Sequence, residues 1–154
     1  MSTNILIVGD IVNTTKIDSF IDSKLEKVIN DQDFSICNFE APVEGKGLKF
    51  KKAGPNISQK KQTIEILKKS GFNLLLLANN HMYDYGSQGL RDTISLAKKH
   101  KLDFISSIEK NCFNPHNLFI CKNKEILFRY YNDVFKWLFE CEVIFSKEKL
   151  NTYG

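Results

Sequence analysis

Several patterns that mark common classes of protein are missing from this sequence. Its four cysteines show neither C-x-x-C spacing nor a compact disulfide framework, so we expect reduced thiols and a cytoplasmic location. No apolar run approaches the ~20 residues that a membrane-spanning helix needs, and no signal peptide precedes Ile5, so no membrane span is expected. The Gly45-Lys46-Gly47 segment lacks the Gly-Lys-Ser/Thr ending of a phosphate-binding P-loop.

The composition indicates one globular domain and gives little sign of nucleic-acid binding. The chain has 154 residues, of which 42% are hydrophobic and 26% charged, enough for one core of ordinary size. Its formal net charge is +4, but a nucleic-acid surface would require a basic stripe interleaved with aromatic residues. The lysines that gather locally, and that could attract an anionic substrate, are Lys46, Lys49, Lys51, Lys52, Lys60 and Lys61.

Three apolar segments are each followed directly by polar side chains. Ile5–Val8 leads to Asp10, Phe34–Cys37 to Asn38 and Glu40, and Leu74–Leu77 to Asn79, Asn80 and His81. Continuous apolar runs are typical of parallel strands buried on both faces, and the carboxyl ends of such strands lie side by side. We therefore expect side chains from these three segments to converge. The alternative is that they act only as turn or capping residues.

The residues expected to converge are Asp10, Glu40, Asn80 and His81. Carboxylate and carboxamide oxygens combined with a neutral imidazole nitrogen suit Mn, Zn or Fe better than Ca or Mg alone. Asp84 follows His81 by three positions. It could orient the His81 ring by accepting its other N–H, or cap the following helix, and the sequence leaves both open.

Strands and helices alternate along the first hundred residues, which predicts an α/β fold with a mainly parallel sheet. Apolar residues at helical spacing predict crossover helices over 17–29, from a Ser58 cap to Lys69, and from a Ser87 cap to His100. Asp103–Ile105 is expected to form the next strand. Right-handed connections of this kind are expected to put helices on both faces of the sheet.

The pattern changes after residue 117. Leu118–Cys121 and Ile126–Tyr131 flank the polar segment Lys122–Glu125, which predicts a hairpin. Residues 134–154 form a divergent aromatic and polar tail with no signal that connects it to the earlier motifs. A sheet that stops early leaves an edge and an apolar patch exposed, so we expect self-association through this C-terminal segment.

In this order, the motifs resemble the bacterial capsule synthesis proteins of the CapA type. The family is associated with poly-γ-glutamate capsule formation and is related in fold to the calcineurin-like metallophosphoesterases. The resemblance implies that Asp10, Glu40, Asn80 and His81 fall at metal-site positions. It further implies that Asn80 is a metal ligand and that His81 lies beside the scissile group.

The chain also departs from the family pattern. Members of the family continue well beyond this length, and their later part supplies further histidine motifs, whereas this chain has three histidines. The resemblance therefore implies that residues 1–133 are the N-terminal part of a truncated metallophosphoesterase-like domain that holds divalent metal ions weakly. The implied function is metal-dependent hydrolysis of a phosphoester or of an amide-linked glutamate polymer. A non-catalytic fragment with a structural or binding role is the alternative.

Overall fold

The computed structural model describes residues 4–106, 116–121, 124–133 and 138–144, with side chains described in the first of these ranges. Its elements are β1 (Ile5–Ile11), α1 (Ser23–Asn30), β2 (Phe34–Phe39), α2 (Gln62–Lys69), β3 (Leu74–Leu76), α3 (Gly86–Lys99), β4 (Asp103–Ile105), β5 (His116–Cys121), β6 (Lys124–Asp133) and β7 (Leu138–Ile144). Strands β1 to β4 form a parallel sheet in the order β1-β2-β3-β4, and β5 to β7 form an antiparallel sheet. The predicted α/β fold with a mainly parallel sheet is confirmed.

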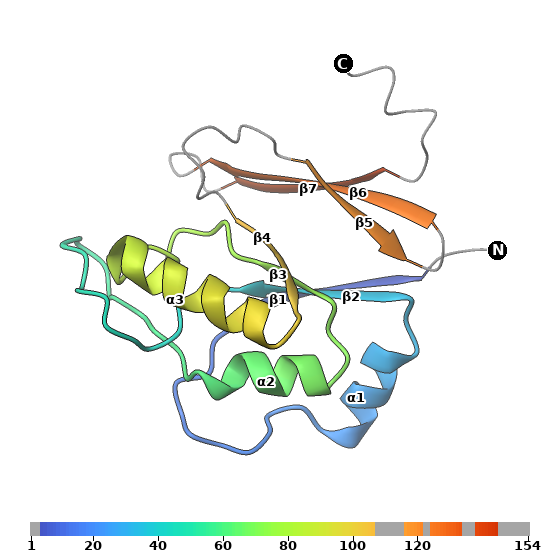
Figure 1. The fold of residues 1–154 in the computed structure, drawn as a ribbon, viewed down its shortest axis with the longest axis horizontal. Coiled ribbons are helices and arrows are strands. Elements are labelled where there is room, and N and C mark those ends of the chain that lie inside the picture. Colours follow the sequence, from blue (N-terminus) through green and yellow to red (C-terminus); the bar gives the residue numbers. More distant parts are fainter. Residues whose placement is uncertain (1–3, 107–115, 122–123, 134–137, 145–154) are drawn as a thin grey trace.

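The described helices lie on one face of the parallel sheet, so the prediction of helices on both faces is wrong (Figure 1). Ile29 of α1, Leu67 of α2 and Leu90 of α3 share one core with Cys37 and Leu75 of the sheet. The strand order is sequential, without the reversal that doubly wound sheets have. Because every right-handed crossover then advances in the same direction, each helix lands on the same face.

The opposite face of the parallel sheet carries a second apolar cluster. Figure 1 shows the β5-β6-β7 sheet on this side, so the layers are helices, parallel sheet and antiparallel sheet. The cluster contains no residue of α1, α2 or α3; its buried members are Phe34, Ile36, Leu74, Leu76, Ala78 and Ile105. Alternate residues of β2 and β3 thus enter two different cores, which explains their continuous apolar sequences.

Helix α1 begins later than the predicted start at Ile17. The Ser19 hydroxyl accepts the Ile21 N–H at 3.1 Å and donates to the Ile21 carbonyl at 3.0 Å, a local alternative to helical hydrogen bonding. Asp22 then caps the helix by accepting the Leu25 N–H at 2.8 Å. The apolar spacing before Ser19 therefore does not continue the helix.

Helices α2 and α3 also begin at other residues than predicted. Ser58 does not cap α2, because the Gln59 N–H donates to the Pro42 carbonyl at 2.9 Å and the Gln59 carbonyl accepts from Glu44 at 2.7 Å. This bridge keeps the chain extended until Lys61. Helix α3 begins at Gly86, ahead of the expected Ser87 cap, with Tyr85 as its N-cap and no side-chain capping bond.

The hairpin predicted near residue 120 is present as the antiparallel pair β5-β6. Strand β7, which pairs with β6 from Asp133↔Leu138 to Leu127↔Ile144, lies in the segment to which the sequence analysis assigned no element. In the part of the chain that the structure describes, no helix has both the length and the apolar character needed to cross a bilayer.

Candidate functional site

A β-bulge at the end of β1 brings the first candidate residue to its neighbours. Val8 pairs with Cys37, but the next pair is Asp10 with Asn38, which leaves Gly9 as the extra residue. Such a bulge re-aims the side chains that follow it. Val8 packs against the core beneath the helices, whereas Asp10 lies on the same face as Asn38. Without the bulge, Asp10 would point to the side of the sheet that the helices cover.

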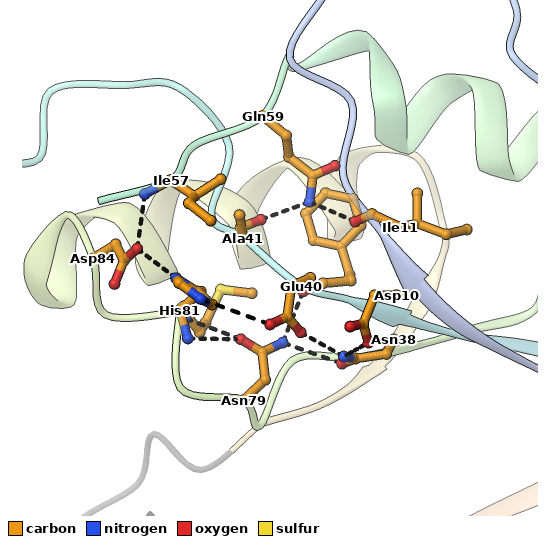
Figure 2. A network of polar contacts seen from close by, with 12 residues as sticks. Asp10, Ile11, Asn38, Glu40, Ala41, Ile57, Gln59, Asn79, His81 and Asp84 are labelled. Atoms are coloured by element: carbon orange, nitrogen blue, oxygen red, sulfur yellow. Dashed lines mark hydrogen bonds and ion pairs between the residues drawn. The ribbon is translucent and has the colours of Figure 1, made fainter. Parts of the chain in front are cut away.

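Asn38 links the two carboxylates at this edge of the sheet (Figure 2). Its side-chain Nδ2 donates to Asp10 Oδ1 and to Glu40 Oε2, both at 2.6 Å. Burial raises the pKa of Glu40 above its usual range, and the negative charge of Asp10 adds to that effect. The site therefore holds two acidic groups close together around one neutral amide.

His81 approaches the same pair from the loop after β3. Its Nε2 lies 4.0 Å from Glu40 Oε1, and its Nδ1 lies 2.7 Å from Asp84 Oδ2. Asp84 therefore contacts His81 and leaves the helix α3 N-terminus without a side-chain cap. Of the two roles that the sequence left open for Asp84, the geometry matches the orientation of His81.

Asp84 is buried and is held by the long loop between β2 and α2. The Ile57 N–H donates to Asp84 Oδ2 at 2.7 Å, and Lys52 Nζ forms an ion pair with Asp84 Oδ1. Burial alone would raise the pKa of Asp84, but the hydrogen bonds from His81, Lys52 and Ile57 outweigh it and hold this pKa below the usual range. Asp84 is therefore a carboxylate at neutral pH.

Asn79, rather than Asn80, joins the polar network. The Asn79 amide donates to the Phe39 carbonyl at 2.9 Å and to Asn38 Oδ1 at 3.2 Å. In the described part of the chain, the Asn80 side chain forms no hydrogen bond. Its proposed role as a metal ligand stays a prediction.

The structure thus brings Asp10, Glu40, His81 and Asp84 into one network, together with three residues that the sequence analysis named but did not choose as site residues. These are Asn38, Asn79 and Lys52. Asn38 is a polar residue near the carboxyl end of β2, a signal that could have identified it. Lys52 carries no such local signal, because only the path of the loop places it at Asp84.

The donor chemistry of this edge suits a divalent cation, but the described ligands form an incomplete set. Carboxylates and an imidazole nitrogen, which are donor types found in Mn, Zn and Fe sites, belong to one hydrogen-bonded network here. Among the side chains described, however, no three from His, Cys, Asp and Glu are placed to hold a metal ion together. The amide nitrogen of Asn38 lies between the two carboxylates.

The fold and the site define an α/β protein whose acidic and imidazole groups gather at the carboxyl edge of a parallel sheet. Its sequence matches the family model "Bacterial capsule synthesis protein PGA_cap" over residues 4–130. The chain therefore belongs to the bacterial capsule synthesis protein family, and its fold class is of the metallophosphoesterase type.

The chain is also similar in sequence to two proteins of capsule biosynthesis. The chain is 38% identical over 105 residues to "Capsule biosynthesis protein CapA" of Bacillus anthracis, a match that covers 66% of this chain and 25% of the relative. It is 30% identical over 109 residues to "PGA biosynthesis protein CapA" of Bacillus subtilis strain 168, covering 65% of this chain and 29% of the relative. The matched region therefore spans a minor part of both relatives.

Proposed function

We propose that this chain contributes to capsule biosynthesis through a metal-dependent, hydrolase-type site built on Asp10, Glu40 and His81. The observation that carries the proposal is the network in which three separate strand ends meet. Asp10 and Glu40 share the Asn38 amide at 2.6 Å, and Glu40 faces His81 Nε2 at 4.0 Å. Acidic and basic groups with distinct environments, gathered at the carboxyl edge of a sheet, are typical of α/β active sites.

His81 is proposed as the proton-transfer residue, and Asp84 as the group that fixes its tautomer. Because Asp84 is ionised, the Nδ1 of His81 must carry the proton in their 2.7 Å hydrogen bond. The lone pair of the neutral ring is then on Nε2, which faces Glu40. In that orientation Nε2 can accept a proton, and the protonated ring can donate one to a leaving oxygen.

Lys52 is proposed to keep Asp84 in place. Its ion pair occupies Asp84 Oδ1, while Oδ2 is used by His81 and Ile57. With each oxygen bound, the carboxylate is restrained against rotation. The His81 ring, which is hydrogen-bonded to Asp84 Oδ2, is restrained in turn. Metal-site and catalytic histidines commonly depend on a carboxylate partner of this kind.

A divalent metal ion is the proposed cofactor, with Asp10, Glu40 and His81 as its donors and Asn80 as the predicted fourth. When bound, such an ion supplies charge neutralisation and activation of water. The acidic pair has a chemical reason to bind a cation, since burial and the negative charge of Asp10 both disfavour the ionised form of Glu40. An incomplete donor set is expected to hold the ion weakly.

The proposed substrate is anionic, and two chemical classes are candidates. One is a phosphoester, which the fold type suggests. The other is an amide-linked glutamate polymer, which the names of the family and of the Bacillus subtilis relative suggest. The lysines of the 46–61 region would favour either class.

Calorimetric titration of the chain with Mn²⁺ or Zn²⁺ tests the metal site directly. We expect saturable binding that Asp10→Asn, Glu40→Gln and His81→Ala each weaken by about 10-fold or more, as expected for loss of a metal-site contact. His100→Ala, at the end of α3, is the matched control and should bind as the unmodified chain does. Equal binding by all variants would overturn the proposal.

Hydrolysis is measured on the same variants with a chromogenic phosphodiester and with γ-linked glutamate oligomers. Because the described donors are incomplete, we expect turnover close to background even with added metal. Robust metal-dependent turnover that His81→Ala abolishes would instead show a complete set of ligands.

The same incomplete donor set favours a second candidate function, a non-catalytic role in structure or binding. Metal binding without turnover, together with retention of an anionic polymer, would support it. A cytoplasmic location and self-association through the C-terminal segment remain predictions from the sequence.

A further inference from the structure

A pocket lies between the loop after β2, the start of α2 and one face of α3. None of the described residues that line it belongs to the polar network around Asp10, Glu40 and His81. Its volume is about 470 Å³, within the range of about 300–1,000 Å³ that small-molecule sites occupy. The pocket is therefore a concave surface separate from the candidate site, with a lining of its own.

Three lysines from three different elements line this pocket. Lys46 belongs to the loop after β2, Lys61 is the N-cap residue of α2, and Lys99 is the last residue of α3. Lys46 and Lys61 come from the group of lysines that lie close together in the sequence, whereas Lys99 joins them only through the fold. Clefts lined by charges of one sign concentrate ligands of the opposite sign.

Two other lysines of the 46–61 region are paired with carboxylates. Lys52 forms an ion pair with Asp84, and Lys60 Nζ lies 2.7 Å from Glu44 Oε2. In the part of the chain that the structure describes, the three pocket lysines form neither a hydrogen bond nor an ion pair. Their ammonium groups can therefore contact a ligand without first leaving another partner.

Hydrogen bonds hold one wall of the pocket in place. The Val43 N–H donates to Thr93 Oγ1 at 3.0 Å, and the Thr93 hydroxyl donates to the Gly89 carbonyl at 2.8 Å. A Cβ added at Gly45 would overlap Asp92 Oδ2, so the loop backbone lies directly against the α3 side chain. The loop and α3 thus form a wall that exists before any ligand binds, as in most small-molecule sites.

Asp92 is the acidic residue among those that line the pocket. Its Oδ1 accepts from Gln88 Nε2 at 2.6 Å. The lining keeps a net positive charge, because three lysines outnumber this one carboxylate. The N-terminus of α2 has no side-chain cap, so the positive end of its dipole adds to the attraction of an anion.

We propose that this pocket binds an anionic ligand with several separated negative charges, which Lys46, Lys61 and Lys99 contact. A water molecule takes about 30 Å³ of liquid volume, so a single inorganic anion would leave most of the pocket unfilled. The lysines also reach the pocket from three separate elements, which suits charges distributed along a chain. Linked carboxylates and linked phosphates share this chemistry. The proposal does not depend on a metal ion at Asp10, Glu40 and His81.

Titration of the whole chain with tri-γ-glutamate and with tripolyphosphate, followed by amide nuclear magnetic resonance in metal-free buffer of low ionic strength, tests this pocket. Lys46→Gln, Lys61→Gln and Lys99→Gln should each weaken binding by about 2- to 5-fold, as expected for loss of one exposed charge pair. Asp92→Asn should strengthen binding by a similar factor, because it removes the opposing charge. Lys24→Gln is the matched control, since it removes the same charge from an exposed position on α1 and should keep the original affinity.

The same spectra report where the ligand binds. The amide signals of Gly45 and Ser95 should shift, and those of Asn79 and His81 should not. Binding of either ligand with this pattern supports the proposal and identifies the linked carboxylate or the linked phosphate as its source. Shifts at Asn79 and His81 in place of Gly45 and Ser95 would overturn it.

Two further results would also contradict the proposal. One is that neither ligand binds. The other is that Lys24→Gln weakens binding as much as the pocket variants do, because the effect would then follow from net charge alone. Since no metal is present in these titrations, failure here leaves the proposed function untouched, and loss of metal binding by the Asp10, Glu40 and His81 variants leaves this proposal untouched.

Discussion

Replacement of Asp84 by asparagine is the most direct test of how the β2–α2 loop supports the site. The Asp84 side chain is 1% exposed and interacts with three donors: the His81 ring, the Lys52 ammonium and the Ile57 N–H. Asparagine offers one acceptor oxygen and one NH₂ group. At least one of the three donors must therefore face another donor in the variant.

The expected loss of stability follows from the burial of the two charges. Removing one partner of a fully buried ion pair typically costs about 3–5 kcal/mol, but the Lys52 side chain is 24% exposed and can regain water. Hydrogen bonds to charged groups contribute about 1.5–3 kcal/mol. We expect Asp84→Asn to lower the free energy of unfolding by about 2–3 kcal/mol at pH 7.

Urea unfolding followed by circular dichroism measures this difference. Glu65→Gln is the control, because Glu65 pairs with Lys69 on the surface of α2, where the two side chains are 46% and 74% exposed. An exposed pair of this kind contributes little to stability, because solvent screens it. Adding Lys52→Met to Asp84→Asn removes the unpaired cation, so the double variant should lose less stability than the sum of the single variants.

The pH dependence of the unfolding free energy provides a second test of the role of Asp84. Burial would raise the pKa of Asp84, but its hydrogen bonds from His81, Lys52 and Ile57 hold that pKa below the usual value. The stabilisation is therefore present above the ordinary carboxylate pKa and is lost as the pH falls through the folded-state pKa. The difference in unfolding free energy between the unmodified protein and Asp84→Asn should become smaller in acid. A difference under about 0.5 kcal/mol at pH 7, or one that grows in acid, would refute this account of Asp84.

Three further perturbations test the fold around the site. Gly47→Ala should destabilise the chain, because a Cβ at this position would overlap the backbone oxygen of Tyr85, the N-cap residue of α3. Gly54→Ala is the control: a Cβ there meets open space, so this variant should unfold at the same urea concentration as the unmodified chain. Leu67→Ala, in the core beneath the helices, should lower the unfolding free energy by about 2–5 kcal/mol, while Leu48→Ala, at 86% exposure, should change it by less than about 0.5 kcal/mol. Size-exclusion chromatography should show oligomers that become monomers when the segment from Val134 onward is removed; a monomeric full chain would contradict the predicted self-association.

The sequence predicted the order of the elements from β1 to β6, but not β7, because local composition determines that order. Apolar runs such as Leu74–Leu77 alternate with amphipathic segments, and this alternation favours parallel strands with crossover helices. The face on which the helices lie was predicted wrongly, because it depends on strand order, and strand order is a long-range property. The start of α1 was also misplaced, because the spacing of apolar residues does not reveal the local hydrogen bonds of Ser19.

The candidate site likewise contains residues that the sequence could identify and one that it could not. Asp10, Glu40 and His81 could be selected from sequence because each lies shortly after an apolar run typical of a strand, and parallel strands end at a common edge. Lys52 could not, because its contact with Asp84 spans 32 positions and depends on a loop that carries no strand or helix. Backbone bonds anchor that loop: Phe50 donates to the Asp84 carbonyl at 2.8 Å.

The bulge at Gly9 depends both on a local sequence signal and on long-range strand pairing. A glycine inside a strand is a recognised sign of a bulge, so the irregularity itself was visible in the sequence. Its consequence was not, because only the register with β2 shows that Asp10 rather than Gly9 pairs with Asn38. One extra residue moves the carboxylate from the helix-covered face to the face of Asn38 and Glu40. The acidic pair therefore depends on strand pairing as much as on the acidic residues themselves, because this pairing places Asn38 where its amide donates to both carboxylates.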